Sequence, residues 1–245
     1  KIAIGGHIAY SRYYLTSNGS VYTSGLNNYG NLGDGTFVAT SAGIAQCTLG
    51  TDNGDIPVTD ILLAGSWNGG TTPSTGMALM SDGTVRMCGY GGAGQTGNGT
   101  ATSHNSSWSN VSLLPPNIES IQANGDDSYT TFGALSSTGN LYMWGTNVLG
   151  VMGTGGYATS QPVPILVNTG VSDFWMHGGV SRAFYKKNGQ IWACGANAVN
   201  GALGVGHANN ITSFEQVMPG IFETGQVEIK EIYGNTGLIG SPSGW

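Results

Sequence analysis

Four five-residue stretches of largely apolar residues, each ending in glycine, recur along the chain: VYTSG from Val21, VRMCG from Val85, LYMWG from Leu141 and IWACG from Ile191. Their length, their aromatic and β-branched residues and the closing glycine predict β-strands. Successive side chains of a strand point to opposite faces. Both faces of these strands are largely apolar, which is typical of a small sheet packed between neighbours on both sides rather than a sheet with one wet face.

A glycine-containing turn precedes each of these strands. Asn18-Gly19, Asp82-Gly83 and Asn188-Gly189 predict type I′ hairpin turns, and Thr138-Gly139 is a weaker form of the same signal. Further apolar stretches lie upstream of the hairpins, and a fifth begins near the C-terminus: KIAIGG from Lys1, TDILLAG from Thr59, ESIQANG from Glu119, SDFWMHGG from Ser172 and KEIYGNTG from Lys230. The sequence therefore predicts that each unit is an upstream strand followed by a hairpin.

The glycines keep the same register in four copies of this unit, near residues 15–36, 79–100, 135–156 and 185–207. Successive copies are 64, 56 and 50 residues apart at their first glycine, a spacing that indicates a propeller or a repeat array. The glycines that we interpret as structural are Gly19, Gly25, Gly33, Gly83, Gly89, Gly97, Gly139, Gly145, Gly153, Gly189, Gly195 and Gly204. We predict a single domain over residues 1–245, with a partial fifth copy from residue 230.

The segments between the copies differ in length and are rich in Thr, Ser, Asn and Gly. The longest runs from about Thr36 to Thr59, and another is TATSHNSSWSN from Thr100. We predict that both segments are loops, because uneven insertions on a regular core are how repeat proteins carry binding loops.

These residues resemble the RCC1 repeat, named after the regulator of chromosome condensation. TSGLNNYGNLGDG from Thr23 and MWGTNVLGVMGTG from Met143 fit its pattern best, the second copy departs from it with YGGAGQTG from Tyr90, and the fourth copy has one inserted residue. The resemblance implies an all-β, RCC1-like β-propeller with about four to five blades in this chain. RCC1-like domains are commonly seven-bladed, so the blades form a smaller ring, an open arc or part of a larger ring.

Composition narrows the class of protein further. Only 8% of residues are charged, against about 25% in an average soluble domain, and the net charge is −6. Nucleic-acid binding is not expected, because it depends on clustered Lys and Arg. No apolar run approaches the roughly 20 residues that span a bilayer, so we predict no membrane insertion. The chain opens at Lys1 without Met or a hydrophobic signal, and we interpret it as a processed chain or an excerpt of a longer one.

No catalytic, metal or cofactor motif stands out from the sequence. Cys47, Cys88 and Cys194 are far apart and lack a CxxC pair, so we interpret them as small buried hydrophobes. The four histidines show no metal-ligand spacing. The acidic turns at residues 52–55 and 126–127 favour turn chemistry over calcium, since neither has the EF-hand spacing. We therefore predict a protein that is not an enzyme and needs no cofactor or metal.

Aromatic residues outside the strands are the candidate binding residues. Tyr29, Tyr90 and Tyr157 lie in glycine-rich loops, while Trp67 and Trp108 lie in polar insertions. Aromatic side chains flanked by Asn and Asp bind sugars or protein partners by stacking and hydrogen bonding. The alternative for each is local packing within its loop.

The uncharged Gly, Asn, Thr and Ser-rich surface is typical of extracellular fibres and virion appendages, whereas cytoplasmic scaffolds usually keep more charge. The first hypothesis is a non-enzymatic virion or surface-fibre propeller, a phage tail-fibre or receptor-binding protein at the virion surface. It would bind a host-surface glycan or protein through loops between blades, assembled with other virion or fibre subunits as a homo-oligomer. The alternatives are a bacterial secreted or surface adhesin and an intracellular RCC1-like interaction or exchange-factor scaffold. The net charge of −6 argues against a nucleosome-binding exchange factor.

Overall fold

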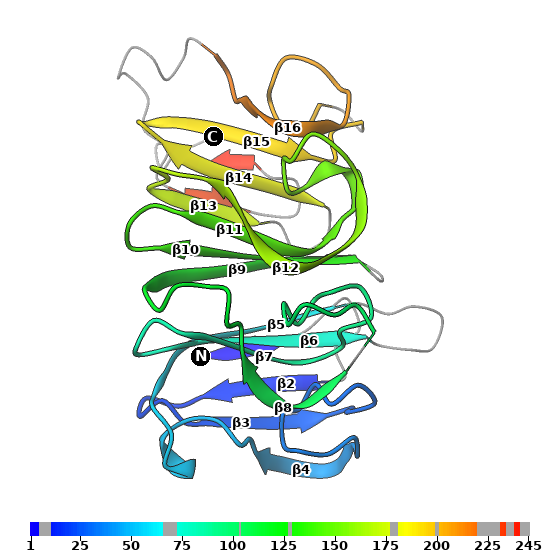
Figure 1. Cartoon of the computed structure of the whole chain (residues 1–245), viewed down its shortest axis with the longest axis vertical. Coiled ribbons are helices and arrows are strands. Elements are labelled where there is room, and N and C mark those ends of the chain that lie inside the picture. The colour runs from blue at the N-terminus through cyan, green and yellow to red at the C-terminus, as the bar shows by residue number, and fades with distance from the viewer. Residues whose placement is uncertain are drawn as a thin grey trace.

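The computed structural model describes residues 1–4, 11–65, 73–102, 104–126, 129–176, 181–198, 201–219, 231–233 and 238–240. Within these residues the fold is all-β and consists of four four-stranded antiparallel sheets and a two-stranded sheet. The four larger sheets, called blades 1 to 4, stack one on the next in chain order (Figure 1). The all-β, four-to-five-blade prediction is therefore confirmed.

Each blade is a meander in which consecutive strands pair. Blade 1 contains β1 (Ile2–Ile4), β2 (Ser11–Leu15), β3 (Val21–Gly25) and β4 (Thr40–Gln46). Blade 2 contains β5 (Val58–Gly65), β6 (Ser74–Met80), β7 (Val85–Gly89) and β8 (Asn105–Asn110). Blade 3 contains β9 (Ile118–Asp126), β10 (Tyr129–Ser136), β11 (Leu141–Asn147) and β12 (Ala158–Asn168). Blade 4 contains β13 (Asp173–Met176), β14 (Arg182–Lys187), β15 (Gln190–Gly195) and β16 (Ile211–Gln216).

The remaining elements are short. Two single-turn 3₁₀ helices, η1 (Thr51–Asn53) and η2 (Val148–Gly150), lie in connections, and β17 (Glu231–Tyr233) pairs with β18 (Leu238–Gly240). The fifth upstream stretch of the sequence thus forms β17, as predicted. No helix in the described part of the chain is long and apolar enough to cross a membrane.

The hydrophobic core is divided among the junctions between blades. Tyr13 and Val21 of blade 1 pack with Ile61 and Ala78 of blade 2 in one cluster, and all four side chains are fully buried. Two further clusters join blade 2 to blade 3 and blade 3 to blade 4. Each inner blade therefore buries both faces, which explains the two-sided apolar pattern of its strands.

The three cysteines are buried thiols at these junctions. Burial raises the pKa of Cys47 to about 12 and holds the pKa values of Cys88 and Cys194 well above their ordinary value. The thiolate is therefore suppressed at neutral pH. The prediction that the cysteines serve as small buried hydrophobes is confirmed.

The type I′ turn prediction is correct in one of the three hairpins that carry an Asn-Gly or Asp-Gly signal. Asn188 and Gly189 both have positive φ, of 52° and 76°, between paired residues Lys187 and Gln190. In blade 1 only Gly19 is positive, and Asn18 is not. The three other hairpins are longer, with five residues between the last strand pair, and a longer connection is built around a turn that needs positive φ only at its glycine.

The interpretation of residues 36–59 and of the segment from Thr100 as loops is wrong in part. They contain β4 and β8, the fourth strands of blades 1 and 2. These edge strands pair along one side only, and the side chains of β8 are all half-buried or exposed. A strand in this position tolerates polar residues. The SSWS sequence of β8 therefore lacks the hydrophobic alternation that predicts a strand.

The loop after the third strand of blades 1, 2 and 3 docks on the fourth strand of the next blade. Backbone amides at Gly35, Gly99 and Gly155 donate to the carbonyls of Ser106, Pro162 and Thr212 at 2.9, 2.9 and 2.6 Å. These loops also approach the strands closely: an ideal Cβ on Gly30 would lie 2.5 Å from Ser106 Cα. The same hydrogen bond therefore joins each successive pair of blades. The close approach at Gly30 leaves no room for a side chain at that position.

Candidate functional site

A buried asparagine organises this loop in three of the four blades. The Oδ1 atoms of Asn27, Asn147 and Asn197 accept the backbone amides of residues 32, 152 and 203 at 2.8, 2.8 and 2.9 Å. All three side chains are at least 98% buried. Blade 2 lacks this asparagine, because Gly91 occupies the equivalent position two residues after Gly89. The second loop is therefore held together differently.

The loop of blade 2 is held by Gln95 and His104 instead. Gln95 Oε1 accepts the amide of Ala93 at 2.7 Å, and His104 Nδ1 accepts the amide of Gly91 at 3.4 Å. The Tyr90 ring lies over Gly92, where an ideal Cβ would be 2.3 Å from the tyrosine hydroxyl oxygen. Because Gly92 has no side chain, the Tyr90 ring can lie against this loop. The other loops do not offer this position.

Three rings meet at this loop and form the Tyr29–Tyr90–His104 cluster. Tyr29 reaches it from the loop of blade 1, and its ring is edge-on to both partners, with centroids 5.2 Å from Tyr90 and 5.0 Å from His104. Tyr90 and His104 stack at 5.0 Å with 25° between their planes. His104 is exposed and both tyrosines are partly exposed. The cluster is therefore a preformed aromatic surface shared by two blades, with ring spacings that aromatic pairs prefer.

We expect the His104 imidazole to titrate below its ordinary pKa of 6.5, because partial desolvation of the ring lowers this pKa. Protonation would also remove the Nδ1 lone pair that accepts the Gly91 amide. The folded state therefore favours the neutral ring, so this contribution to stability is complete above pH 6.5 and is lost as pH falls through the folded-state pKa. An NMR titration of the ring protons measures it, and a midpoint at or above 6.5 would contradict the expectation.

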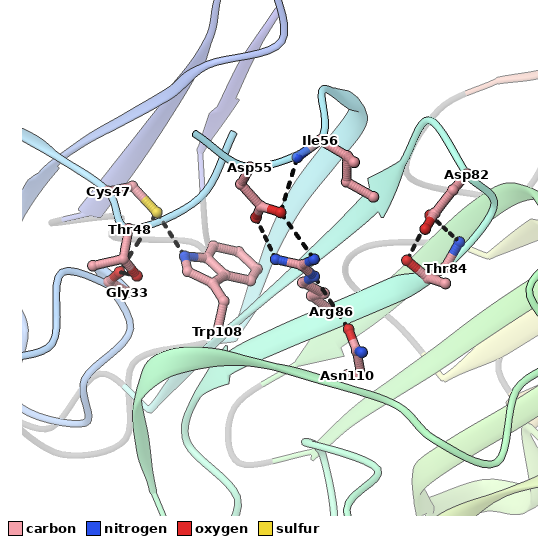
Figure 2. Close-up of polar contacts among 10 residues, drawn as sticks. All are labelled: Gly33, Cys47, Thr48, Asp55, Ile56, Asp82, Thr84, Arg86, Trp108 and Asn110. Atoms are coloured by element: carbon pink, nitrogen blue, oxygen red, sulfur yellow. Dashed lines mark hydrogen bonds and ion pairs between the residues drawn. The ribbon is translucent and has the colours of Figure 1, made fainter. Parts of the chain in front are cut away.

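The other candidate aromatics lie elsewhere. Trp108 does not lie in a polar insertion: it lies half-buried in β8, and its indole donates to Cys47 Sγ at 2.6 Å (Figure 2). Its ring centroid is 5.7 Å from that of Tyr13. Trp108 therefore packs between blades 1 and 2. Tyr157 is 64% exposed beyond the loop of blade 3, and Trp67 lies outside the described residues. Of the four predicted residues within the described ranges, the structure brings Tyr29 and Tyr90 together.

His104 was not among the predicted site residues. One histidine in a Ser/Asn-rich segment carries no motif, and the sequence predicts a loop for that segment. The one available signal was indirect: the second copy departs from the repeat at Gly91, next to a tyrosine. A break in an otherwise consistent pattern is where a functional or strained site is expected.

The acidic turns near this region serve structural roles. Asp55 pairs with Arg86 through both carboxylate oxygens and also accepts the Ile56 amide at 2.9 Å, while Arg86 Nε donates to Asn110 at 3.1 Å (Figure 2). Asp82 caps its own hairpin through the amide and hydroxyl of Thr84. Among the described residues, no three His, Cys, Asp or Glu side chains are grouped closely enough to hold a metal ion.

Comparison with known proteins supports the fold. No protein-family model matches the chain. The crystal structure of human WBSCR16 is similar with a TM-score of 0.67 and 20% identity, covering 91% of this chain and 52% of that one. Yeast RCC1 (Prp20) bound to Kap60 matches with a TM-score of 0.67 and 18% identity, covering 90% and 48%. Prp20p from Saccharomyces cerevisiae, described with its binding to Gsp1p and histones, matches with a TM-score of 0.64 and 18% identity, covering 90% and 50%.

The chain therefore has the RCC1-like propeller fold that its repeats resemble, and it spans about half the length of the chains it matches. Four blades account for that half, so within the described residues the fold is a partial propeller rather than a complete seven-bladed ring. At this level of identity the similarity establishes the fold alone.

Proposed function

We propose that this chain is a non-catalytic interaction module that binds a protein partner through the loop surface at the junction of blades 1 and 2. One observation carries the proposal: the Tyr29–Tyr90–His104 cluster forms where blade 2 abandons the asparagine that the other three blades use. Partly exposed tyrosines fixed on a rigid scaffold are the kind of residue that supplies most of the energy of a protein interface.

The structural relatives favour a protein ligand over other classes. Yeast Prp20 is described in complex with Kap60 and with binding to Gsp1p and histones, so this fold serves protein recognition in that protein. A fold does not carry its partners from one protein to another. What transfers is the general mode of use, an intracellular RCC1-like scaffold with loops on a rigid propeller.

A second candidate is glycan recognition by a virion, tail-fibre or adhesin propeller. Composition favours it, because only 8% of residues are charged and Gly, Asn, Thr and Ser dominate the loops. Tyrosine rings with neighbouring asparagines also suit sugar stacking. The same aromatic cluster would then contact a sugar face, in an extracellular or virion-surface protein.

One binding experiment separates the two candidates. The chain and its Tyr29→Ala, Tyr90→Ala and Tyr157→Ala variants are tested against Gsp1p, Kap60, histones and a glycan array. We expect a protein partner whose affinity falls at least about tenfold in Tyr90→Ala and stays unchanged in Tyr157→Ala, where a more exposed ring outside the cluster is removed. Glycan binding that Tyr90→Ala abolishes would replace the proposal with the second candidate. Protein binding insensitive to Tyr29→Ala and Tyr90→Ala would overturn the assigned site.

A further inference from the structure

The loop of blade 2, residues 90–100, has the same backbone turns as the loop of blade 1, although it lacks the organising asparagine. The amides of Gly30 and Gly94 each donate to the carbonyl three residues earlier at 3.0 Å, and those of Gly33 and Gly97 do the same at 3.0 and 3.1 Å. The backbone therefore keeps the place that an asparagine side chain fills in the other loops.

In the loop of blade 1, the Asn27 side chain joins a buried amide to the exposed end of the loop. Its Oδ1 accepts the amide of Leu32, which is 0% exposed, and its Nδ2 donates to the carbonyl of the exposed Thr36 at 3.0 Å. The equivalents of Leu32 and Thr36 in blade 2 are the buried Thr96 and the exposed Thr100. The place of the missing side chain thus extends from the interior of this loop to its exposed end.

Thr96 is the residue that the missing side chain leaves with unmet hydrogen bonds. It is 1% exposed, and its Oγ1 has no hydrogen-bond partner. Its backbone amide has no acceptor among the described residues, whereas the equivalent amide in each of the other three loops donates to an asparagine Oδ1. Gln95 does not substitute, because its Oε1 accepts the amide of Ala93. A buried donor and a buried hydroxyl in one residue therefore gain stability from any group that pairs with them.

A carboxamide is the group that suits both of these partners. Its oxygen accepts an amide, as Asn27 Oδ1 does in the loop of blade 1, and its NH₂ group donates to a hydroxyl oxygen. An apolar group would leave Thr96 unpaired. A carboxylate would be buried without a counter-ion, because residues 26–36 and 90–100 contain no Lys or Arg.

We propose that the loop of blade 2 binds a side-chain carboxamide, supplied by an asparagine or glutamine of the protein partner. The source of the group rests on the proposed function, whereas the carboxamide site in the loop does not. The Gly91 amide donates to His104 Nδ1 at 3.4 Å, so the loop adjoins the Tyr29–Tyr90–His104 cluster. A bound partner would thus place its carboxamide in the loop while it covers the aromatic rings.

Acetamide, a free carboxamide, tests the site without a partner. In NMR spectra of the ¹⁵N-labelled chain, we expect acetamide, and not acetate, to shift the Thr96 amide resonance in a saturable way. Gly91→Asn should abolish this shift, because its own side chain then pairs with Thr96. The matched control is Gly91→Ala, which adds a Cβ without an amide and should keep the shift. The φ of Gly91 is not positive, so both side chains suit its backbone conformation.

Three results would overturn the proposal: no saturable shift at Thr96 with acetamide, an equal shift with acetate, or a shift that Gly91→Asn leaves intact. If Gly91→Asn fails to fold, as circular dichroism would show, amide hydrogen exchange of the unaltered chain gives the same decision. The Thr96 amide is expected to exchange faster than those of Leu32 and Met152, and acetamide should slow it. Equal rates for the three amides would contradict the proposal.

Thr96→Val tests whether the partner supplies the group. Against a protein that binds in the experiment described above, we expect this variant to lose about three- to tenfold in affinity. Its unfolding midpoint should not fall, because replacing an unpaired buried hydroxyl with a methyl group is neutral or stabilising. Unchanged affinity in Thr96→Val, together with weaker binding in Tyr90→Ala, would refute the partner's carboxamide and leave the proposed function intact.

Discussion

Gly33→Val is expected to lower the free energy of unfolding by about 2–5 kcal/mol. Gly33 has φ +64°, and an ideal Cβ there would lie 2.1 Å from the indole nitrogen of Trp108 in the next blade. A side chain in this backbone conformation costs roughly 1–2 kcal/mol, and overpacking a filled contact adds about 1–3 kcal/mol. The indole cannot retreat freely, because it also donates to Cys47 Sγ.

Gly54→Val is the matched control for this prediction. Gly54 has a similar φ of +72° but open space around its Cβ position, so it should lose only the roughly 1–2 kcal/mol of backbone strain. Urea unfolding followed by circular dichroism measures both variants. Equal losses would mean that the Trp108 contact contributes nothing, and an unchanged midpoint for Gly33→Val would count against positive φ at this turn.

The first three strands of each blade could be predicted because their signals are local. In each copy a glycine lies at a fixed distance before and after the third strand, and Val21, Leu141 and Ile191 repeat the same apolar position within it. All twelve glycines that the register singled out have positive φ. Backbone conformation and two-sided burial therefore leave a pattern that one sequence is enough to show.

The fourth strands could not be predicted, because tertiary contacts hold them rather than their own composition. Met87 and Gly89 pair with Ser109 and Asn105 across a register shift, so β8 does not follow simple alternation. Similar irregularities occur where β4, β12 and β16 join their blades. Such strands are defined by the loop of the preceding blade and by their neighbour, neither of which is adjacent in sequence.

The candidate site could be predicted from the sequence only in part, for the same reason. Tyr29 and Tyr90 stand out as aromatic residues in glycine-rich loops, but they are 61 positions apart in the sequence, and only the stacking of blades brings their rings together. Trp108 shows the opposite error, since a tryptophan among serines suggests an exposed ring. Its indole instead fills the space that Gly33 leaves open.

Trp144→Ala is expected to be the most damaging single change, with a loss of about 3–5 kcal/mol in the free energy of unfolding. Trp144 is 0% exposed between blades 2 and 3 and stacks on Phe132 with centroids 5.9 Å apart. Its indole nitrogen donates to the carbonyl of Gln95 at 2.9 Å. Truncation would leave both a cavity and a buried carbonyl without its donor, which carries its own cost of about 1–3 kcal/mol.

Trp144→Phe and Trp192→Ala divide this loss into its causes. Trp144→Phe keeps a ring and should cost chiefly the hydrogen bond to Gln95. Trp192 lies on the equivalent face of blade 4 but is only partly buried, so Trp192→Ala should cost less than half as much as Trp144→Ala. Similar losses for the two alanine variants would show that burial at the junction of blades 2 and 3 does not set the energy.

Calorimetry of Trp144→Ala further tests how the blades are coupled. Each blade shares its core mainly with its neighbours, and stability in such stacked repeats is close to a sum of repeat and nearest-neighbour terms. Weakening one junction should then broaden the thermal transition or split it into two, one for each side of the junction. A single sharp transition at lower temperature would instead show that the stack unfolds as one cooperative unit, despite its divided core.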